Sequence, residues 1–405
     1  MTVSVITFGC RLNAHESDGM LHYAQHGQDQ DNKQTIIVNT CTVTAEAERQ
    51  ARQAIRRAHR ENPEAEIIVT GCASERAPKE WGALEGVQRV VTNDEKLSPA
   101  SWGVDRKANL PPPPSKHTRA LLQVQQGCDH RCTFCVIPYG RGQSKATALF
   151  DVISRARTLT EAGHEEIVLT GVDIASWKEG THGLGKLCQE LLKHIPALKR
   201  LRLSSLDPVL LHPETGDKDL WELIASEPRF MPHLHLSLQA GSDLILKRMK
   251  RRHRTNEVSY AIKEIRKLRP DLGFGADLIA GFPTETDELF EETFRFIEEN
   301  ALPFLHVFPY SERPGTPAAK MPPLPRSIRQ ERAARLRALG NDIKTKFLTS
   351  FIGQEKDVLL ETAIMGHTPE FAVVTLTDKA ALTPGKTYRL RLLAVEDYKI
   401  NAEIA

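Results

Sequence analysis

The chain has 405 residues, a formal net charge of +2 and a hydrophobic share of 40%. This length exceeds one ordinary core, so we expect two or three domains. No stretch approaches the roughly 20 apolar residues of a membrane span, and the first residues, MTVSVITFGC, are typical of a strand rather than a signal peptide. We therefore expect a cytoplasmic protein without membrane contact. Seven cysteines, an odd number, favour metal ligation in a reducing compartment over a disulfide framework.

The first hundred residues contain a repeat. The apolar runs VSVITFGC, TIIVNTC and EIIVTGC end at Cys10, Cys41 and Cys72, at intervals of 31 residues. Helix-like segments lie between them, the clearest at 45–60. Strands and helices alternating at this spacing predict a doubly wound parallel sheet, which we assign to a domain at 1–98.

The carboxyl ends of parallel strands line the crevice where ligands bind. Three thiols at three such ends can meet at one point, and Gly9 and Gly71 allow the backbone to turn closely around a bulky ligand. We expect Cys10, Cys41 and Cys72 to hold a metal cluster, although free cysteine is also a common core residue. The nearby polar residues either hydrogen-bond this ligand or make caps and turns; they are Thr7, Asn13, Asn39 and Thr42.

A Pro-rich linker is expected at 99–118 because Pro111–Pro114 stiffens the chain there. After an expected strand at 120–125 comes GCDHRCTFCVIPY, in which Cys128, Cys132 and Cys135 have the spacing C-x3-C-x2-C. Three thiolates can bind three irons of a cubane cluster and leave the fourth iron open. A zinc site completed by His130 is the alternative.

This motif, with Phe134 before its last cysteine, resembles the cluster-binding signature of radical S-adenosylmethionine (SAM) enzymes. The resemblance implies a [4Fe-4S] cluster whose open iron takes the amino and carboxylate groups of SAM. Reductive cleavage of SAM then yields a 5′-deoxyadenosyl radical.

Downstream, strand-like and helix-like runs alternate. Six strands are expected at 120–125, 166–170, 200–204, 233–238, 274–279 and 304–309. They predict an open (β/α)6 partial barrel within 119–325, with its functional loops at the carboxyl ends of the strands. An open side suits a macromolecular substrate.

The loops after these strands contain polar residues that we expect to bind SAM. By resemblance, the loop after the second strand meets the methionyl amine and the loop after the fourth approaches the ribose. Ordinary turns and caps also use these residue types. The candidates are Gly171, Asp173, Ser204, Ser237, Gln239 and Glu285.

The segments TGVDI, RLSSLDP, HLSLQAGSD, AGFPTET and HVFPYSERPGTPA resemble the barrel of the methylthiotransferases within the radical SAM enzymes. In the last of them, Arg313 suggests a rigid loop that faces the substrate. A connecting helix is expected within 326–350. At 351–405, short strand-like runs predict a small antiparallel barrel that resembles an RNA-binding TRAM domain. This module is slightly acidic, with six Lys or Arg against eight Asp or Glu.

Basic residues concentrate elsewhere. Residues 247–269 contain ten Lys or Arg against two Glu, and residues 326–346 contain seven against two acidic residues. A third group, Arg49, Arg52, Arg56, Arg57 and Arg60, lies on an early helix. Such patches attract RNA phosphates, but a solvated helix face has the same composition.

The methylthiotransferase resemblance covers nearly the whole chain and implies two [4Fe-4S] clusters. One SAM methylates a sulfur at the Cys10, Cys41 and Cys72 cluster; a second, cleaved at the other cluster, generates the radical. TFGCRLN, VNTCTVTAEAERQARQAIRR and GCDHRCTFCVIPYGRG are most similar to the branch that modifies N6-threonylcarbamoyladenosine next to the anticodon of tRNA. The expected partners are a tRNA and an electron donor such as flavodoxin or ferredoxin.

Sister branches modify isopentenyladenosine in tRNA or an aspartate of a ribosomal protein. A rival of another class is a non-catalytic RNA-binding protein with structural zinc. Cys188, in GLGKLCQELL at helical spacing, is predicted to be a core residue.

Overall fold

The computed structural model describes residues 3–27, 34–105, 113, 115–377 and 382–405. The chain forms two compact units. The first comprises Met1–Lys116, Gln125–Lys145 and Ser311–Thr316, and the second comprises His117–Val124, Ala146–Tyr310 and Pro317–Ala405. The loop that carries the C-x3-C-x2-C motif is therefore part of the same unit as the N-terminal repeat. Most of the expected proline linker, at 106–112 and 114, lies outside the described residues.

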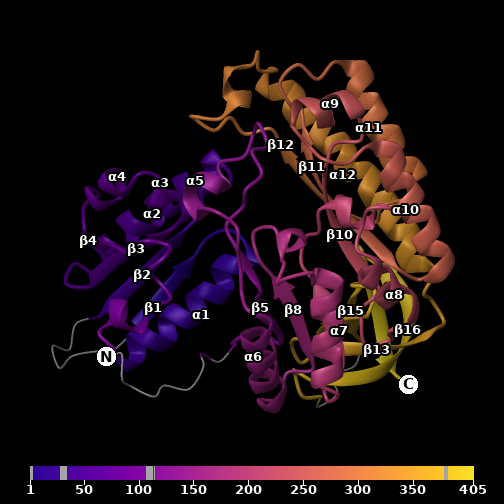
Figure 1. The fold of residues 1–405 in the computed structure, drawn as a ribbon, viewed down its shortest axis with the longest axis horizontal. Coiled ribbons are helices and arrows are strands. Elements are labelled where there is room, and N and C mark those ends of the chain that lie inside the picture. Colours follow the sequence, from indigo (N-terminus) through magenta and orange to yellow (C-terminus); the bar gives the residue numbers. More distant parts are fainter. Residues whose placement is uncertain (1–2, 28–33, 106–112, 114, 378–381) are drawn as a thin grey trace. The chain divides into compact units, whose positions relative to one another are not determined.

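A parallel sheet forms the centre of the first unit (Figure 1). Its strands are hydrogen-bonded in the order β1 (Val3–Thr7), β2 (Thr35–Thr40), β3 (Glu66–Gly71) and β4 (Val87–Val90). The first three are the runs of the sequence repeat. The fourth was not predicted, because its sequence VQRV is short and half polar.

Helices cover both faces of this sheet. Helix α1 (Arg11–His26) packs Met20 on the face that carries Ile37, and α2 (Ala45–Glu61) packs Ile55 on the face that carries Val38. Successive side chains of β2 point to opposite faces of the sheet, so this strand contributes to two hydrophobic cores. Helices on both faces confirm the predicted doubly wound domain. Short helices α3 (Cys72–Arg76) and α4 (Pro78–Gly82) and the 3-10 turn η1 (Pro99–Trp102) complete this part.

Helix α2 shows why the sequence folds locally as predicted. Thr44 caps its first turn by accepting a hydrogen bond from the Ala47 amide at 3.1 Å. Acidic residues occupy the first turn and basic residues the last, as the helix dipole favours. Arg52 stacks on Trp81, 4.4 Å from the ring centre, so this arginine contributes to packing.

The second unit contains six parallel strands in two three-stranded sheets. The sheets are β5·β8·β9 and β10·β11·β12, and a bridge between Leu206 and Leu236 joins them. This arrangement confirms the open six-stranded barrel. The strands are β5 (Arg119–Gln123), β8 (Glu166–Thr170), β9 (Arg200–Leu203), β10 (His233–Gln239), β11 (Gly273–Ala280) and β12 (Phe304–Pro309).

Helices surround the barrel on its outer side (Figure 1). Their apolar faces and the strands share one large core, which includes the fully buried Cys188, as predicted. The helices are α6 (Leu149–Glu161), α7 (Leu184–His194), α8 (Lys218–Ser226), α9 (Asp243–Arg248), α10 (Thr255–Leu268), α11 (Asp287–Glu299) and α12 (Arg326–Thr349). None of the described helices is both long and apolar enough to cross a membrane.

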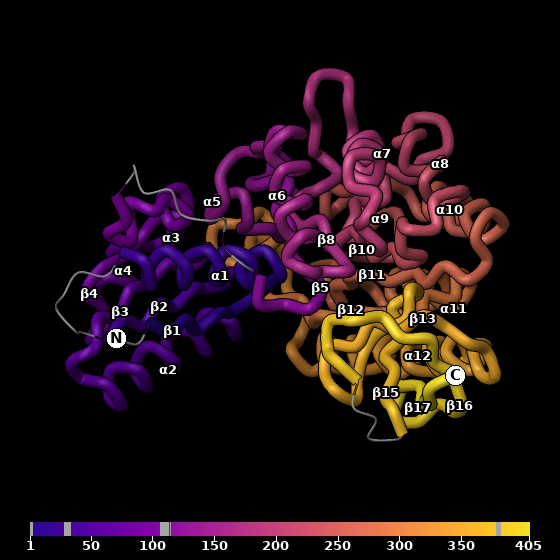
Figure 2. The backbone as a smooth tube through the Cα atoms, turned by 90° about the horizontal axis from the view of Figure 1, so that it is seen from below, coloured from indigo at the N-terminus to yellow at the C-terminus, as the bar shows by residue number. Residues whose placement is uncertain are grey.

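A small closed barrel follows α12 (Figure 2). Four of its five strand pairs are antiparallel and one, β15·β17, is parallel. The short strand β14 was not predicted. The strands are β13 (Glu355–Leu360), β14 (Met365–His367), β15 (Val373–Leu376), β16 (Thr387–Glu396) and β17 (Lys399–Ile404).

This small barrel docks on the amino ends of the larger barrel's strands. Glu361 pairs with Arg119, the first residue of β5, at 2.6 Å. Arg202 donates to the Pro369 carbonyl at 3.0 Å and to Glu166, the first residue of β8, at 2.7 Å. The functional loops at the carboxyl ends are therefore left uncovered by this contact.

Phe371 closes the same end of the larger barrel. It stacks on His233 and His367, with ring centres 4.6 and 4.7 Å apart. Its φ of +75° is unusual for a residue with a side chain, and the contacts on both sides of the ring hold it there.

Candidate functional site

The three cysteines of the repeat lie at the carboxyl edge of the first sheet. Cys10 precedes α1 as its N-cap, Cys41 directly follows β2, and Cys72 is the first residue of α3. Cys10 is exposed, whereas Cys41 and Cys72 are buried. The equal spacing in the sequence thus becomes equivalent positions in the sheet.

The three thiols are close enough to influence one another. Burial raises the pKa of Cys41 to about 11, and the charges of Cys72 and Cys10 raise it further. Gly9 has φ +95°, and a Cβ at this position would lie 2.7 Å from the Cys41 sulfur. Glycine is required here both by the backbone conformation and by the approach of Cys41.

The polar neighbours of this trio hold the loops in place. Asn13 donates to the carbonyls of Phe8 and Thr40 at 2.7 and 3.1 Å, which ties two strand ends together. Asn39 donates to the Asn13 carbonyl at 3.0 Å, and Thr7 donates to Ser17 at 2.8 Å. The Cys10 thiol also donates to Asn13 Oδ1 at 4.0 Å, so Asn13 both holds the loops and contacts one of the sulfurs.

The second trio lies on a loop between β6 (Gln125–Gln126) and α5 (Ile137–Arg141). The Cys128 amide donates to the Gly142 carbonyl at 3.0 Å, and the Cys135 amide donates to the Cys132 carbonyl at 3.1 Å. The side-chain amide of Gln125 donates a hydrogen bond to the Gly127 carbonyl at 2.7 Å, which stabilises the start of the loop. All three cysteines are half-buried, as an accessible cluster site requires.

Arg141, six residues after Cys135, extends from the second loop to the first trio. Its Nε donates to the Cys72 sulfur at 3.0 Å. Its two terminal nitrogens donate to both oxygens of Glu16 and to Asn13 Oδ1. Arg141 was not predicted as a site residue, since a single arginine in YGRG carries no distinctive signal.

Glu16 is the buried anion beneath this arginine. Lys96 also donates to it, at 2.6 Å, and neither Glu16 nor Lys96 is exposed. Burial alone would raise the pKa of Glu16, but Arg141 and Lys96 lower it to about 2. One anion between two cations leaves a net positive charge beside the thiols, which suits an anionic ligand such as an iron-sulfur cluster.

The donor set of each trio fits an iron-sulfur cluster. A tetrahedral zinc site with Zn–S bonds of about 2.3 Å needs sulfurs about 3.8 Å apart. Within the described parts of the chain, three ligand atoms approach to within 4.8 Å of one another only at His235, Asp277 and His306. Ligands of a cubane cluster bind different irons and are spread more widely, so three thiolates that are not gathered within 4.8 Å are compatible with such a cluster.

Arg313, which we expected to face the substrate, is buried within the first unit. It donates to Thr42 at 3.2 Å and also to Glu48, and only 4% of the residue is exposed. Arg76 also donates to Thr42, at 2.8 Å, and to the Pro314 carbonyl at 3.1 Å. These contacts hold Thr42, the residue that follows Cys41, in place.

The expected SAM contacts all belong to the second unit, where five of the six lie at or just beyond carboxyl ends of strands. Gly171 and Asp173 follow β8, and Ser204 follows β9. Ser237 donates to the Leu206 carbonyl at 3.1 Å, across the bridge between the two sheets. Gln239 ends β10 with φ +75°, next to a shift in strand register. Such strained residues cluster at ligand sites.

Glu285, the sixth candidate, is held by the protein itself. One carboxylate oxygen accepts from Arg332 at 2.6 Å and from the Gly281 amide at 3.0 Å. Burial raises the pKa of Glu285, and Arg332 opposes this shift. Glu285 therefore positions the loop after β11 against α12.

Many residues of the basic segments are also structural. Arg251 and Arg252 both pair with the buried Asp207, at 3.1 and 3.0 Å. Arg329 and Arg337 of α12 donate to barrel carbonyls at 2.7 and 3.0 Å. These four arginines therefore stabilise the packing of helices and loops on the barrel, in addition to carrying positive charge.

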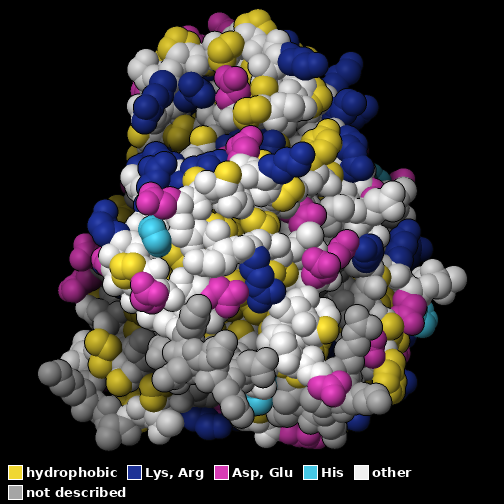
Figure 3. All heavy atoms as spheres, turned by 90° about the vertical axis from the view of Figure 1, so that its left-hand side faces the viewer, with side chains coloured by type: hydrophobic (Ala, Val, Ile, Leu, Met, Phe, Trp, Pro, Cys, Tyr) yellow, Lys and Arg dark blue, Asp and Glu magenta, His cyan; other side chains and the backbone are white. Residues whose placement is uncertain are grey.

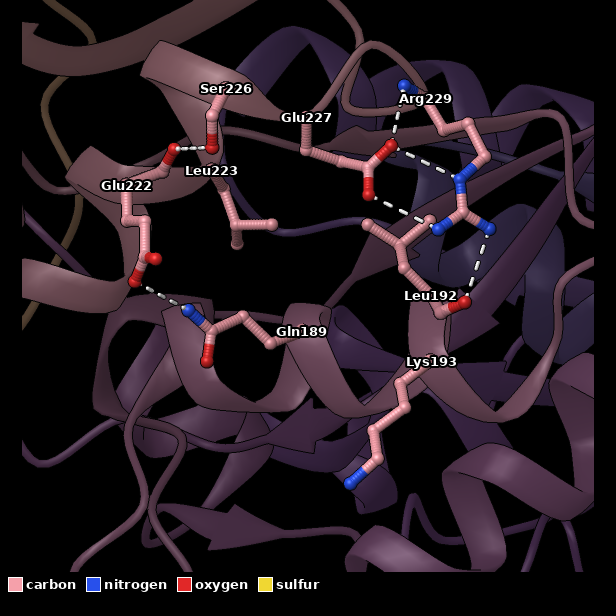
Figure 4. Close-up of a pocket in the computed structure, with 8 residues that line it drawn as sticks. All are labelled: Gln189, Leu192, Lys193, Glu222, Leu223, Ser226, Glu227 and Arg229. Carbon is pink, nitrogen blue, oxygen red and sulfur yellow. Dashed lines mark hydrogen bonds and ion pairs between the residues drawn. The ribbon is translucent and has the colours of Figure 1, made fainter.

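A cavity of about 260 Å³ lies between α7 and α8 (Figure 4). Its polar side chains satisfy one another: Glu227 pairs with Arg229 at 3.0 Å, and Gln189 donates to Glu222 at 3.2 Å. It lies between outer helices and away from the carboxyl ends of the strands, so we do not assign it to the functional site.

The six-stranded barrel and the C-x3-C-x2-C loop define a radical SAM enzyme. Residues 122–297 match the family model of the radical SAM superfamily, and residues 2–92 match the uncharacterized protein family UPF0004. The radical SAM methyltransferase TsrM from Kitasatospora setae has a similar fold, with a TM-score of 0.56 and 14% identity over 79% of this chain and 77% of that one.

Two relatives match over nearly their full length. The threonylcarbamoyladenosine tRNA methylthiotransferase MtaB of Rickettsia prowazekii is 43% identical over 97% of this chain and 95% of its own. The protein of the same name from Bacillus subtilis is 34% identical over 93% and 88%. The chain belongs to the MtaB family of methylthiotransferases, and as a radical SAM enzyme it uses SAM and a [4Fe-4S] cluster.

Proposed function

We propose that this chain attaches a methylthio group to C2 of N6-threonylcarbamoyladenosine next to the anticodon of a tRNA. The similarity to MtaB proteins over nearly the whole chain carries this proposal. The family matches at 2–92 and 122–297 span both cysteine trios, which this activity needs together. The sister branches share the same domain organisation. We choose threonylcarbamoyladenosine as the substrate because the similar proteins are named for it.

Cys128, Cys132 and Cys135 hold the cluster that binds SAM, and Cys10, Cys41 and Cys72 hold a second [4Fe-4S] cluster. When bound, these groups supply a carbon radical and a sulfur donor, which can replace the unactivated hydrogen of an aromatic carbon. No side-chain base removes such a hydrogen near neutral pH. The protein contributes binding, orientation and exclusion of water.

The residues around the first trio support this assignment. Gly9, with φ +95°, leaves room for the Cys41 thiol, and Gly71, with φ +101°, leaves room for the backbone of Thr40 next to Cys41. Arg141 directs its Nε hydrogen at the Cys72 sulfur, and hydrogen bonds to sulfur tune the reduction potential of a cluster. In the second unit, Gly171, Asp173, Ser204, Ser237 and Gln239 form the SAM pocket.

Positive charge assists tRNA binding. Arg49, Arg56 and Arg57 of α2 are exposed, and Lys and Arg side chains gather toward the top of the face in Figure 3. The C-terminal barrel acts as a TRAM-like module that recognises RNA by shape and local contacts, because its overall charge is slightly negative. An electron donor such as flavodoxin or ferredoxin supplies the electron for SAM cleavage.

Nucleoside mass spectrometry tests the substrate. In cells without this gene, the methylthio form of threonylcarbamoyladenosine should disappear and the unmethylthiolated form should accumulate. Loss of methylthio-isopentenyladenosine instead would assign the chain to the sister branch.

Cysteine variants test the division of labour between the trios. Anaerobically reconstituted protein should be brown with about eight irons per chain, whereas a structural-zinc protein would be colourless. Cys132→Ala should abolish SAM cleavage, and Cys41→Ala should preserve it but stop methylthiolation. Cys188→Ala is the matched control because that thiol is buried in the core. Methylthio product from the Cys41 variant would contradict the proposed role of the first trio.

A further inference from the structure

Three potential metal ligands meet inside the larger barrel, on strands β10, β11 and β12. His235, Asp277 and His306 come from these three neighbouring strands (Figure 1). Asp277 pairs with His306 in the strand register, and His235 pairs with Gly275, two residues before Asp277. Alternate residues of a strand share a face, so the three side chains reach one point.

Their ligand atoms are spaced as around a single ion. His235 Nε2 lies 3.0 Å from Asp277 Oδ1, and His306 Nδ1 lies 3.3 Å from the same oxygen. All three atoms lie within 4.8 Å of one another. Tetrahedral zinc with bonds of about 2.0–2.1 Å places its ligand atoms about 3.3 Å apart. The two distances to Asp277 Oδ1 are near this value, and the distance between the two imidazole nitrogens is at most 4.8 Å.

The surroundings support these ligands. Ser205 donates to Asp277 Oδ2 at 2.9 Å, which orients the carboxylate and leaves Oδ1 for the ion, as outer partners of metal ligands commonly do. Gly275 makes room for the His235 ring, because a Cβ there would lie 2.3 Å from Nδ1. The glycine is not in a left-handed conformation, so space rather than backbone geometry explains it.

One side of the cluster is closed and the other is open. The ring of His233, which stacks on Phe371, is centred 6.3 Å from that of His235 on the closed side. Side-chain exposure then rises from 10% at His235 to 24% at Asp277 and 60% at His306. Three protein ligands with an open fourth position are the arrangement of a reactive rather than a structural zinc site.

We infer that His235, Asp277 and His306 bind one divalent transition-metal ion, with zinc as the reference ion, separate from both cysteine trios. The fourth position takes water or a carboxylate oxygen, since zinc accepts both. This inference depends neither on the clusters nor on tRNA. The alternative is a hydrogen-bonded cluster in which both imidazoles share Asp277 without an ion.

Equilibrium dialysis of the cluster-loaded full chain against Zn²⁺ tests the site, with zinc and iron counted by mass spectrometry. The unaltered chain should bind about one zinc more than Asp277→Asn or His306→Ala, at equal iron content. His306 is exposed, so its truncation should leave the fold intact. His182→Ala, which removes an exposed histidine elsewhere, should behave like the unaltered chain, and Ser205→Ala should weaken binding roughly tenfold.

X-ray absorption at the zinc edge excludes binding by stray thiols. The spectrum should contain only nitrogen and oxygen neighbours at about 2.0–2.1 Å, without sulfur at about 2.3 Å. Equal zinc in the unaltered chain and in Asp277→Asn would overturn the inference, as would a sulfur shell. The absence of bound zinc in the unaltered chain would leave the hydrogen-bonded cluster as the correct description.

Discussion

The buried contact between Arg141 and Glu16 leads to a quantitative prediction for Arg141→Met. Methionine keeps much of the side-chain length but removes the guanidinium, which donates to both Glu16 oxygens, to Asn13 and to the Cys72 sulfur. Glu16 then remains fully buried with Lys96 as its remaining cation. We expect the first unit to become less stable and the second to be unaffected.

The size of the effect follows from the pKa of Glu16. A fall from 4.5 to about 2 corresponds to roughly 3 kcal/mol of preference for the ionised form. Arg141 and Lys96 share this preference, but the loss of one partner of a buried ion pair typically costs roughly 3–5 kcal/mol. We therefore expect Arg141→Met to lower the free energy of unfolding of the first unit by about 3 kcal/mol.

Hydrogen exchange measured by mass spectrometry resolves the two units. Amides of β2 and β3 should exchange roughly a hundredfold faster in Arg141→Met, while amides of α10 and α11 should not change. Arg131→Met is the matched control, since Arg131 is exposed on the same cysteine loop and donates only to nearby carbonyls. A loss below about 1 kcal/mol in the first unit would refute the reasoning.

Three further substitutions test other parts of the structure. Gly9→Ala places a Cβ 2.7 Å from the Cys41 sulfur, so reconstituted iron should fall from about eight to about four per chain; Gly82→Ala, with ordinary space, should keep it. Burial would raise the pKa of Glu166, but neighbouring arginines lower it to about 2, so its stabilising contribution is complete above pH 4.5 and is lost as pH falls toward 2. Acid unfolding followed by near-ultraviolet circular dichroism should be less steep in that range for Glu166→Gln. Phe371→Ala should cost roughly 3 kcal/mol and accelerate hydrogen exchange in β13–β17.

Strong periodic patterns allowed much of the fold to be predicted from the sequence. The three runs that end in cysteine became β1, β2 and β3, and the six barrel strands were placed to within about two residues. Among the missed strands, Val87–Val90 and Met365–His367 have four and three residues. They are too short for an alternating pattern to stand out, and pairing with longer neighbours stabilises them.

Side-chain clusters assembled by strand register were not predicted. His235, Asp277 and His306 are separated by 42 and 29 residues, and each is an ordinary strand residue when considered alone. Glu16 and Lys96, 80 residues apart, were also missed, because charged residues are rarely buried unless they are paired. The sequence shows which of these residues are present, but it does not show that the fold brings them together.

The position of the C-terminal barrel affects how a long substrate is held. It contacts the amino ends of β5, β8 and β9, and these strands of four or five residues extend roughly 15 Å from there to their carboxyl ends. A tRNA bound by this barrel, as proposed above, would be anchored a full strand length from the reacting base. Substitutions on the barrel surface should raise KM and leave kcat unchanged, because the anchor and the chemistry act on different segments of the same molecule.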